Sequence, residues 1–168
     1  NLANSPEGPF ELKVNDLVIK DVVVGEVWLC SGQSNMEMPI KGFVAQPVQG
    51  AAEAIRESYA HPDIRIFNVG RNRTETLQDD CKGEWKKPTP KNVAECSATA
   101  YFFGRMLTDI LGVPVGLVTS YWGGTKAEFF NLYEITAMHL KECFPDLKIG
   151  GPALAHNEEW AEDFLQEM

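Results

Sequence analysis

Two apolar stretches, each ending in small and polar residues, constrain the fold of this chain more than any other feature. Residues 21–30 read DVVVGEVWLC and continue into SGQSNM, and residues 113–120 read VPVGLVTS and continue into YWGGT. Long apolar runs of this kind are typical of strands buried on both faces of a sheet. Glycine and serine directly after such a run indicate a turn that leaves the sheet. The sequence therefore predicts two core strands, with glycine-flanked turns at their carboxyl ends.

The rest of the chain alternates between strand and helix patterns, which is typical of parallel βαβ units. We therefore expect an α/β fold: a three-layer, flavodoxin-like, mostly parallel sheet with helices on both faces, preceded by a short β-hairpin. Ligands bind at the carboxyl ends of the strands in such sheets. The other predicted elements are a hairpin over 10–20, a helix over 51–60, a strand over 63–69, a polar loop over 70–92, a helix over 93–111 ended by Gly112, a helix from Thr125 to about Cys143, a strand over 147–150 and a last helix after Asn157.

Charge and hydropathy exclude two classes of partner. The chain has 168 residues and a formal net charge of −9, with a sequence pI near 4.8. Binding to nucleic acid or to an anionic membrane surface needs clustered Lys and Arg, so we expect neither. The sequence holds no apolar run of about 18 residues, which a membrane span requires. A neutral substrate fits this chain better.

The cysteines indicate neither a metal site nor a disulfide framework. They are widely spaced, form no C-x-x-C pair and are expected as buried free thiols. We therefore expect no metal and no cofactor. The four residues are Cys30, Cys81, Cys96 and Cys143.

Ser34 follows the first apolar run and is the candidate nucleophile. A serine in a tight strand-to-loop turn can be held clear of the sheet, with a backbone N–H directed at the group that it attacks. The stretch SGQSN lacks the G-x-S-x-G pattern of a nucleophile elbow. On the residues alone, an ordinary turn without catalytic role remains an alternative.

The stretch DVVVGEVWLCSGQSNMEMPI resembles the region around the nucleophile in the sialate O-acetylesterase family, a branch of the SGNH hydrolases. The similarity continues through GEWK, SATAYFFGRML and LGVPVGLVTSYWGGTKAE, and it covers about residues 10–128. The resemblance implies an SGNH fold and a serine esterase that removes O-acetyl groups from a carbohydrate such as sialic acid or decorated xylan. It also suggests a secreted or periplasmic bacterial protein; no signal peptide is visible from Asn1 onward, so the localisation stays open.

The resemblance assigns roles to particular residues of the turn and of WGGT. Ser34 matches the nucleophile, and its own N–H would be one oxyanion donor. Gly123 and Gly124 match a second oxyanion element, since glycine lets backbone N–H groups approach the substrate closely. Gln33 and Asn35 flank the serine and are expected to orient the substrate or to brace the turn.

An acid and a base are harder to assign. Glu128 matches an acidic position of the family, but it also completes a T-x-x-E capping box that needs no catalytic role. The family's later G-E-S-N-like and Asp-x-x-His elements do not occur here. Of the three histidines, His61 is expected in a solvated loop and His139 in a packed helix. His156, in the loop after the last predicted strand, is the remaining candidate base, although it also fits an ordinary position before a helix.

Residues 123–168 resemble a helix–strand–helix unit of β-xylosidases with a (β/α)8 barrel. The Asn-Glu-Pro motif of those enzymes is missing, and no pair of facing carboxylates can be named. We interpret the chain as a hairpin segment (1–24), an incomplete SGNH-like esterase core (25–122) and a xylosidase-like tail (123–168). A natural fusion, a recombined metagenomic clone and a truncated product all remain open.

Three functions are consistent with this organisation. The first is the O-acetylesterase, acting on an acetylated carbohydrate. The second is a xylan-active glycoside hydrolase, and the third is a non-catalytic carbohydrate-binding fragment that uses exposed tryptophans. A homo-oligomer is also open, because a second copy could supply the missing histidine.

Overall fold

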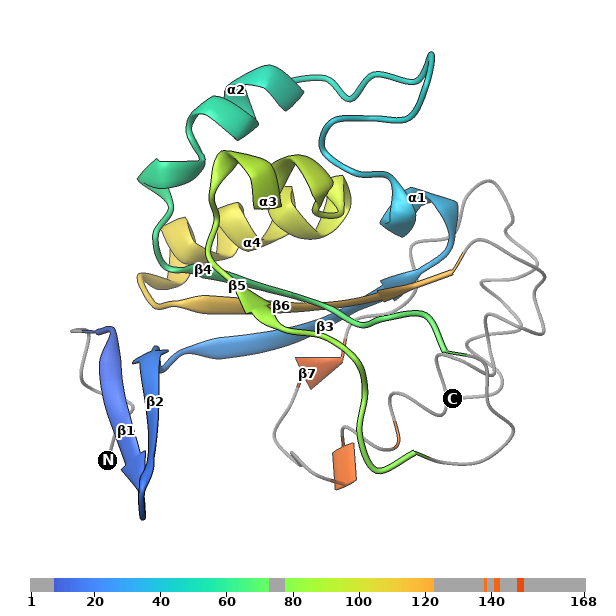
Figure 1. Cartoon of the computed structure of the whole chain (residues 1–168). Helices are drawn as coiled ribbons and strands as arrows, with labels where there is room; N and C mark the ends of the chain where they lie inside the picture. The colour runs from blue at the N-terminus through green and yellow to red at the C-terminus, as the bar shows by residue number, and fades with distance from the viewer. Residues whose placement is uncertain (1–7, 73–77, 123–137, 139–140, 143–147, 150–168) are drawn as a thin grey trace.

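The computed structural model describes residues 8–72, 78–122, 138, 141–142 and 148–149. These residues form a two-stranded sheet and a five-stranded sheet with helices packed on it (Figure 1). The elements are β1 (Phe10–Val14), β2 (Leu17–Val22), β3 (Glu26–Gly32), α1 (Ser34–Glu37), α2 (Ala51–Arg56), a 3-10 turn (Ser58–Ala60), β4 (Ile64–Asn68), β5 (Trp85–Lys86), α3 (Pro90–Glu95), α4 (Ala98–Leu111), β6 (Val115–Tyr121) and β7 (Lys148–Ile149).

The larger sheet has the order β5-β4-β6-β3-β7 and is mostly parallel. β6 lies between β4 and β3 and is parallel to both, and β7 is parallel to β3. Among the described strands of this sheet, only β5, at the edge, is antiparallel to its neighbour. β3 and β6 pair in register from Glu26–Val115 to Gly32–Tyr121, so their carboxyl ends lie side by side. The expected α/β fold with a mostly parallel sheet is confirmed.

Helices α1 to α4 cover one face of this sheet (Figure 1). Ile64, Ile66 and Leu117 of the strands are buried in one cluster with Tyr101 of α4. Gly104 brings α4 close to the sheet, since a Cβ at this position would lie 2.8 Å from Leu117 Cδ1. The helices predicted after Thr125 and Asn157 lie outside the described residues, apart from the helical residues 138 and 141–142.

The apolar run over residues 21–30 is not one strand, contrary to the sequence prediction. Asp21 belongs to β2, and β3 begins only at Glu26. Gly25 packs against the other core strand, because a Cβ there would lie 1.9 Å from the Pro114 carbonyl oxygen. The backbone N–H of Glu26 donates to the same oxygen at 2.9 Å. This contact sets where β3 begins.

The predicted helix over 93–111 is two helices, α3 and α4, separated at Cys96 and Ser97. The backbone at this break is hydrogen-bonded to a distant segment of the chain. Ile40 N–H donates to the Cys96 carbonyl, and Ala98 N–H donates to the Met38 carbonyl, both at 2.8 Å. Two other predicted boundaries also differ from the structure. The predicted loop over 70–92 contains β5 and the start of α3. The predicted helix over 51–60 ends at Arg56 and is followed by a 3-10 turn.

Three of the cysteines lie within the described residues and are free thiols, as expected. Cys30 and Cys96 are buried, and burial raises the pKa of each thiol to about 12, so both stay protonated and unreactive. Cys81 is exposed, contrary to the expected burial. It lies in the connection from β4 to β5, outside the described helices and strands.

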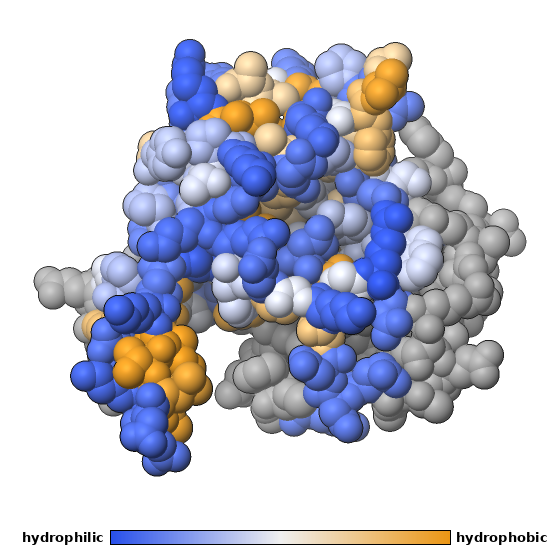
Figure 2. Space-filling model, in the orientation of Figure 1, coloured by the Kyte–Doolittle hydropathy of each residue, from blue (hydrophilic) through white to orange (hydrophobic). Residues whose placement is uncertain are grey.

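The β1–β2 hairpin extends away from the larger sheet (Figure 1). Leu12 pairs with Ile19 and Val14 with Leu17, which places four apolar side chains on one face. All four are exposed, and the hairpin carries an apolar patch in Figure 2.

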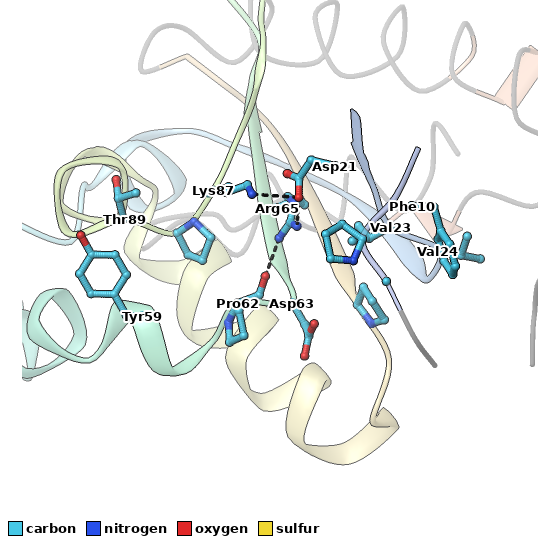
Figure 3. Close-up of a pocket in the computed structure, with 14 residues that line it drawn as sticks. Phe10, Asp21, Val23, Val24, Tyr59, Pro62, Asp63, Arg65, Lys87 and Thr89 are labelled. Carbon is cyan, nitrogen blue, oxygen red and sulfur yellow. Dashed lines mark hydrogen bonds and ion pairs between the residues drawn. The ribbon is translucent and has the colours of Figure 1, made fainter. Parts of the chain in front are cut away.

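Asp21 joins the hairpin to the amino end of the larger sheet. Its Oδ1 atom lies 3.0 Å from Arg65 Nη2 and 3.0 Å from Lys87 Nζ. The Arg65 side chain is only 9% exposed and also donates to the carbonyls of Pro62 and Ile64. These groups line a cavity of about 310 Å³ between the hairpin and the sheet (Figure 3).

We expect this attachment to weaken at acid pH. Burial alone raises the pKa of the Asp21 carboxyl, but hydrogen bonds and attraction from Lys87 and Arg65 outweigh burial, so the net pKa lies below 3.8. A carboxyl with a lowered folded-state pKa stabilises above its unfolded pKa and loses that contribution as the pH falls through the folded value. Amide protection of β1 and β2, measured by hydrogen exchange, should therefore decrease below about pH 4.

In the Asp21→Asn variant, the amides of β1 and β2 should be poorly protected at neutral pH as well. In the Asp16→Asn variant, which changes the hairpin turn, their protection should equal that of the wild type. Unchanged protection in Asp21→Asn would show that the ion pairs do not hold the hairpin.

Candidate active site

Ser34 lies where β3 passes into α1, at the carboxyl edge of the larger sheet. β3 ends at Gly32, and Ser34 is the first residue of α1. The Ser34 side chain is exposed, whereas Gln33 and Met36 on either side are 9% and 6% exposed. The buried strand thus presents one serine to solvent while its neighbours anchor the turn.

Hydrogen bonds to α4 hold the short helix α1 in place. Ser97 Oγ donates to Met36 Sδ at 3.2 Å, and Thr99 Oγ1 donates to the Asn35 carbonyl at 3.1 Å. Within the turn itself, Met38 N–H donates to the Ser34 carbonyl at 3.0 Å. The position of Ser34 therefore depends on the first turn of α4 as well as on β3.

A second group of side chains lies at the same edge, and we call it the edge cluster: Glu37, Asn68, Arg71, Tyr121 and Trp122. Trp122 N–H donates to the Gly32 carbonyl at 3.1 Å, which extends the β3–β6 pairing to the residue before Gln33. The Arg71 guanidinium lies over the Trp122 ring, 5.7 Å from its centroid, and forms an ion pair with Glu37. Asn68 Nδ2 donates to Tyr121 Oη at 3.0 Å.

The pKa of the Tyr121 phenol reflects this arrangement. Burial is the largest influence and raises the pKa above its usual value, and the negative charge of Glu37 raises it further. The hydrogen bond from Asn68 and the positive charge of Arg71 act in the opposite direction but do not reverse the shift. Tyr121 is therefore a neutral phenol at physiological pH, within electrostatic range of both charges of the Glu37–Arg71 pair.

Of the residues predicted for the site, Gln33, Ser34 and Asn35 lie together in one turn at the carboxyl edge. Gly123, Gly124, Glu128 and His156 lie outside the described residues, so their roles stay predictions.

His61 lies at the opposite, amino end of the sheet. Its carbonyl accepts from the N–H of Ile64, the first residue of β4. Burial and, to a lesser degree, the charge of Arg105 lower the pKa of its imidazole. The side chain is half-buried rather than fully solvated. Its position excludes it as a base for Ser34 within this chain.

Sequence reasoning missed most of the edge cluster. Asn68 and Arg71 come at and just after the end of β4, and Tyr121 ends β6. Because the carboxyl ends of parallel strands meet at one edge, polar residues at these positions are candidates for the same site as Ser34. The sequence does not show which strands are neighbours in the sheet, and only the observed strand order places β4 beside β6.

Among the described residues, no three His, Cys, Asp or Glu side chains cluster as ligands for a metal ion. No described helix has the length and apolar character to cross a membrane.

An exposed serine in the turn after a central strand of a parallel α/β sheet is the arrangement that defines one class of serine hydrolase site. Comparison with known proteins narrows this class. The chain is 37% identical over 169 residues to the sialate O-acetylesterase of Mus musculus, covering 89% of this chain and 30% of that protein. It is 35% identical over 154 residues to the Homo sapiens sialate O-acetylesterase, covering 82% of this chain and 28% of that protein.

A solved structure supports the same relationship. A carbohydrate acetylesterase from Xanthomonas citri matches with a TM-score of 0.64 at 37% sequence identity, covering 71% of this chain and 27% of that chain. The resemblance to the sialate O-acetylesterase family and the SGNH-like fold are thus confirmed. The chain spans less than a third of the length of these relatives.

The second resemblance, to β-xylosidases, is confirmed for the tail. The family model described as glycosyl hydrolases family 39 matches residues 118–168. The β-xylosidase of Geobacillus stearothermophilus is 44% identical over 50 residues, which cover 29% of this chain and 10% of that protein. The match to the Mus musculus protein covers 89% of this chain, so it overlaps part of residues 118–168.

Ser97→Ala should destabilise the region that carries Ser34. The Ser97 hydroxyl is buried, accepts from Ala100 N–H at 3.2 Å as the N-cap of α4, and donates to Met36. Losing an N-cap side chain costs about 1 kcal/mol, so urea denaturation should show a decrease of that size in the free energy of unfolding. Thr108→Ala is the control, because its hydroxyl bonds only within α4. Equal changes in both variants would contradict the capping role.

Proposed function

We propose that this chain carries the nucleophile of a carbohydrate O-acetylesterase, a serine hydrolase that removes acetyl groups from sialic acid or from xylan-type sugars. The observation that carries the proposal is the exposed Ser34 at the carboxyl edge of a parallel sheet, in a chain similar to sialate O-acetylesterases over most of its length. The proposed partner is an acetylated carbohydrate, which the similarity to a carbohydrate acetylesterase supports.

In the proposed reaction, Ser34 Oγ attacks the carbonyl carbon of the acetyl group. The sugar hydroxyl leaves, and water then hydrolyses the acetyl-serine to acetate. The backbone N–H of Ser34 and those of Gly123 and Gly124 are the proposed oxyanion donors, each worth about 3 kcal/mol of barrier. Burial of Gln33 favours a role in bracing the turn, whereas the exposed Asn35 is available to orient the substrate.

The proton of Ser34 needs an acceptor, and His156 is the proposed one, from the same chain or from a second copy in a homo-oligomer. Glu128 is assigned to the substrate side of the site, with helix capping as its other role. Removing a triad member typically costs about four or more orders of magnitude in turnover. Because the family's Asp-x-x-His does not occur in this sequence, we expect slow hydrolysis.

Ser34→Ala should abolish acetate release from p-nitrophenyl acetate and from acetylated xylan, because no nucleophile remains. His156→Ala should reduce the rate of acetate release below that of the wild type. Ser31→Ala is the matched control: Ser31 is buried within β3, so its removal should leave the rate unchanged. Equal rates for wild type and Ser34→Ala would refute the assignment.

The match of residues 118–168 to glycosyl hydrolases family 39 favours a second candidate, a xylan-active glycoside hydrolase. Such an enzyme needs two carboxyl groups at the glycosidic bond, and Glu158 or Glu159 in the tail is the candidate for one of them.

This second candidate predicts release of the aryl group from aryl xylosides. The activity should survive Ser34→Ala and be lost in Glu158→Gln or Glu159→Gln, since the chemistry would depend on carboxylates alone. If the wild-type chain cleaves no aryl xyloside, the second candidate is removed.

A further inference from the structure

The two charged side chains of the edge cluster are paired with each other beside Ser34. Glu37 is three residues after Ser34 on α1, a spacing that places both on neighbouring parts of one helix surface. Arg71, just beyond β4, contacts Glu37 Oε1 through Nη2. The pair therefore joins the helix that begins with the nucleophile to the connection after β4.

The Trp122 ring contacts the same guanidinium. The Arg71 guanidinium carbon lies 5.7 Å from the centroid of the Trp122 ring. The Trp122 backbone is itself bonded to the Gly32 carbonyl, directly before Gln33 and Ser34. Both supports of Arg71 thus adjoin the nucleophile turn, one on α1 and one at the end of β6.

The charges of this pair compensate each other at the sheet edge that carries Ser34. The Arg71 side chain is 51% exposed and that of Glu37 is 24% exposed, so both reach the surface of the site. An anionic substrate attracted by the guanidinium would be repelled by the adjacent carboxylate, in a chain whose formal net charge is −9.

An uncharged sugar fits the same surface. A guanidinium has five N–H donors, and the bond to Glu37 uses Nη2, so the contacts among the described residues leave further donors for sugar hydroxyls. The Trp122 ring offers an amphipathic aromatic surface, and the Asn68–Tyr121 pair adds polar groups without charge.

We propose that the Glu37–Arg71 pair on Trp122 is a specificity-determining wall of the acetyl-sugar site, which selects uncharged acetylated sugars over anionic ones. The inference rests on the proposed esterase function and narrows its substrate class. The wall acts through charge compensation, so changing one member of the pair changes the preference and changing both restores it.

The experiment measures binding to the Ser34→Ala chain by NMR titration with two probes, an acetylated xylo-oligosaccharide and an O-acetylated sialic acid. The chain should bind the neutral probe more tightly. Adding Glu37→Gln leaves the guanidinium uncompensated, so affinity for the anionic probe should rise about fivefold, as expected for a partly exposed charge pair. This gain should disappear at 1 M salt, where the Debye length is about 3 Å.

Two further variants test the charge dependence: one removes the positive charge of the pair, and one removes a negative charge far from Ser34. Arg71→Gln removes the positive charge beside Glu37 and should weaken anionic-probe binding more than neutral-probe binding. The Glu37→Gln/Arg71→Gln double variant should restore the starting ratio. Glu53→Gln, in an exposed ion pair on α2, makes the same charge change away from the site and should leave the ratio unaltered.

Three results would overturn the inference: a preference for the anionic probe, no binding of either probe, or a ratio that Glu37→Gln does not alter. Failure of the esterase proposal is a separate result, because it is measured as equal acetate release from p-nitrophenyl acetate by the wild type and Ser34→Ala. Ser34-dependent release together with an unaltered binding ratio would refute the wall alone.

Discussion

The parallel pairing of β3 with β6 is the interaction on which the rest of the candidate site depends. The two strands stay in register to Gly32 and Tyr121, and Trp122 extends the hydrogen bonding by one residue. Because both strands end at the same level, the turn that carries Ser34 and the start of W-G-G-T lie at one edge. At the other end, the close contact of Gly25 with Pro114 sets where this pairing begins.

The end of β3 alone does not hold Ser34 in place, and the break between α3 and α4 supplies a second support. Ser97 caps α4 and also donates to Met36, and the backbone of Met38 accepts from Ala98. A continuous helix would have used these backbone groups internally. The interruption therefore exchanges helical hydrogen bonds for contacts that fix α1 against the core.

The edge cluster connects the fold to the choice of substrate. Arg71 is held both by the carboxylate of Glu37 and by the ring of Trp122, so its charge is compensated and its orientation is restrained. The compensated charge fits the proposed preference of this acidic chain for uncharged sugars.

The sequence by itself determined the mostly parallel sheet, the end of α4 at Gly112 and the presentation of Ser34 after β3, because apolar periodicity and turn residues act over short stretches of chain. Only the tertiary structure decided the division of residues 21–30 between two strands, the break at Cys96 and Ser97, and the distance of His61 from the site. It also decided the meeting of Glu37 with Arg71, which are 34 positions apart. These features depend on strand order and on hydrogen bonds between remote segments, which no local pattern of residues encodes.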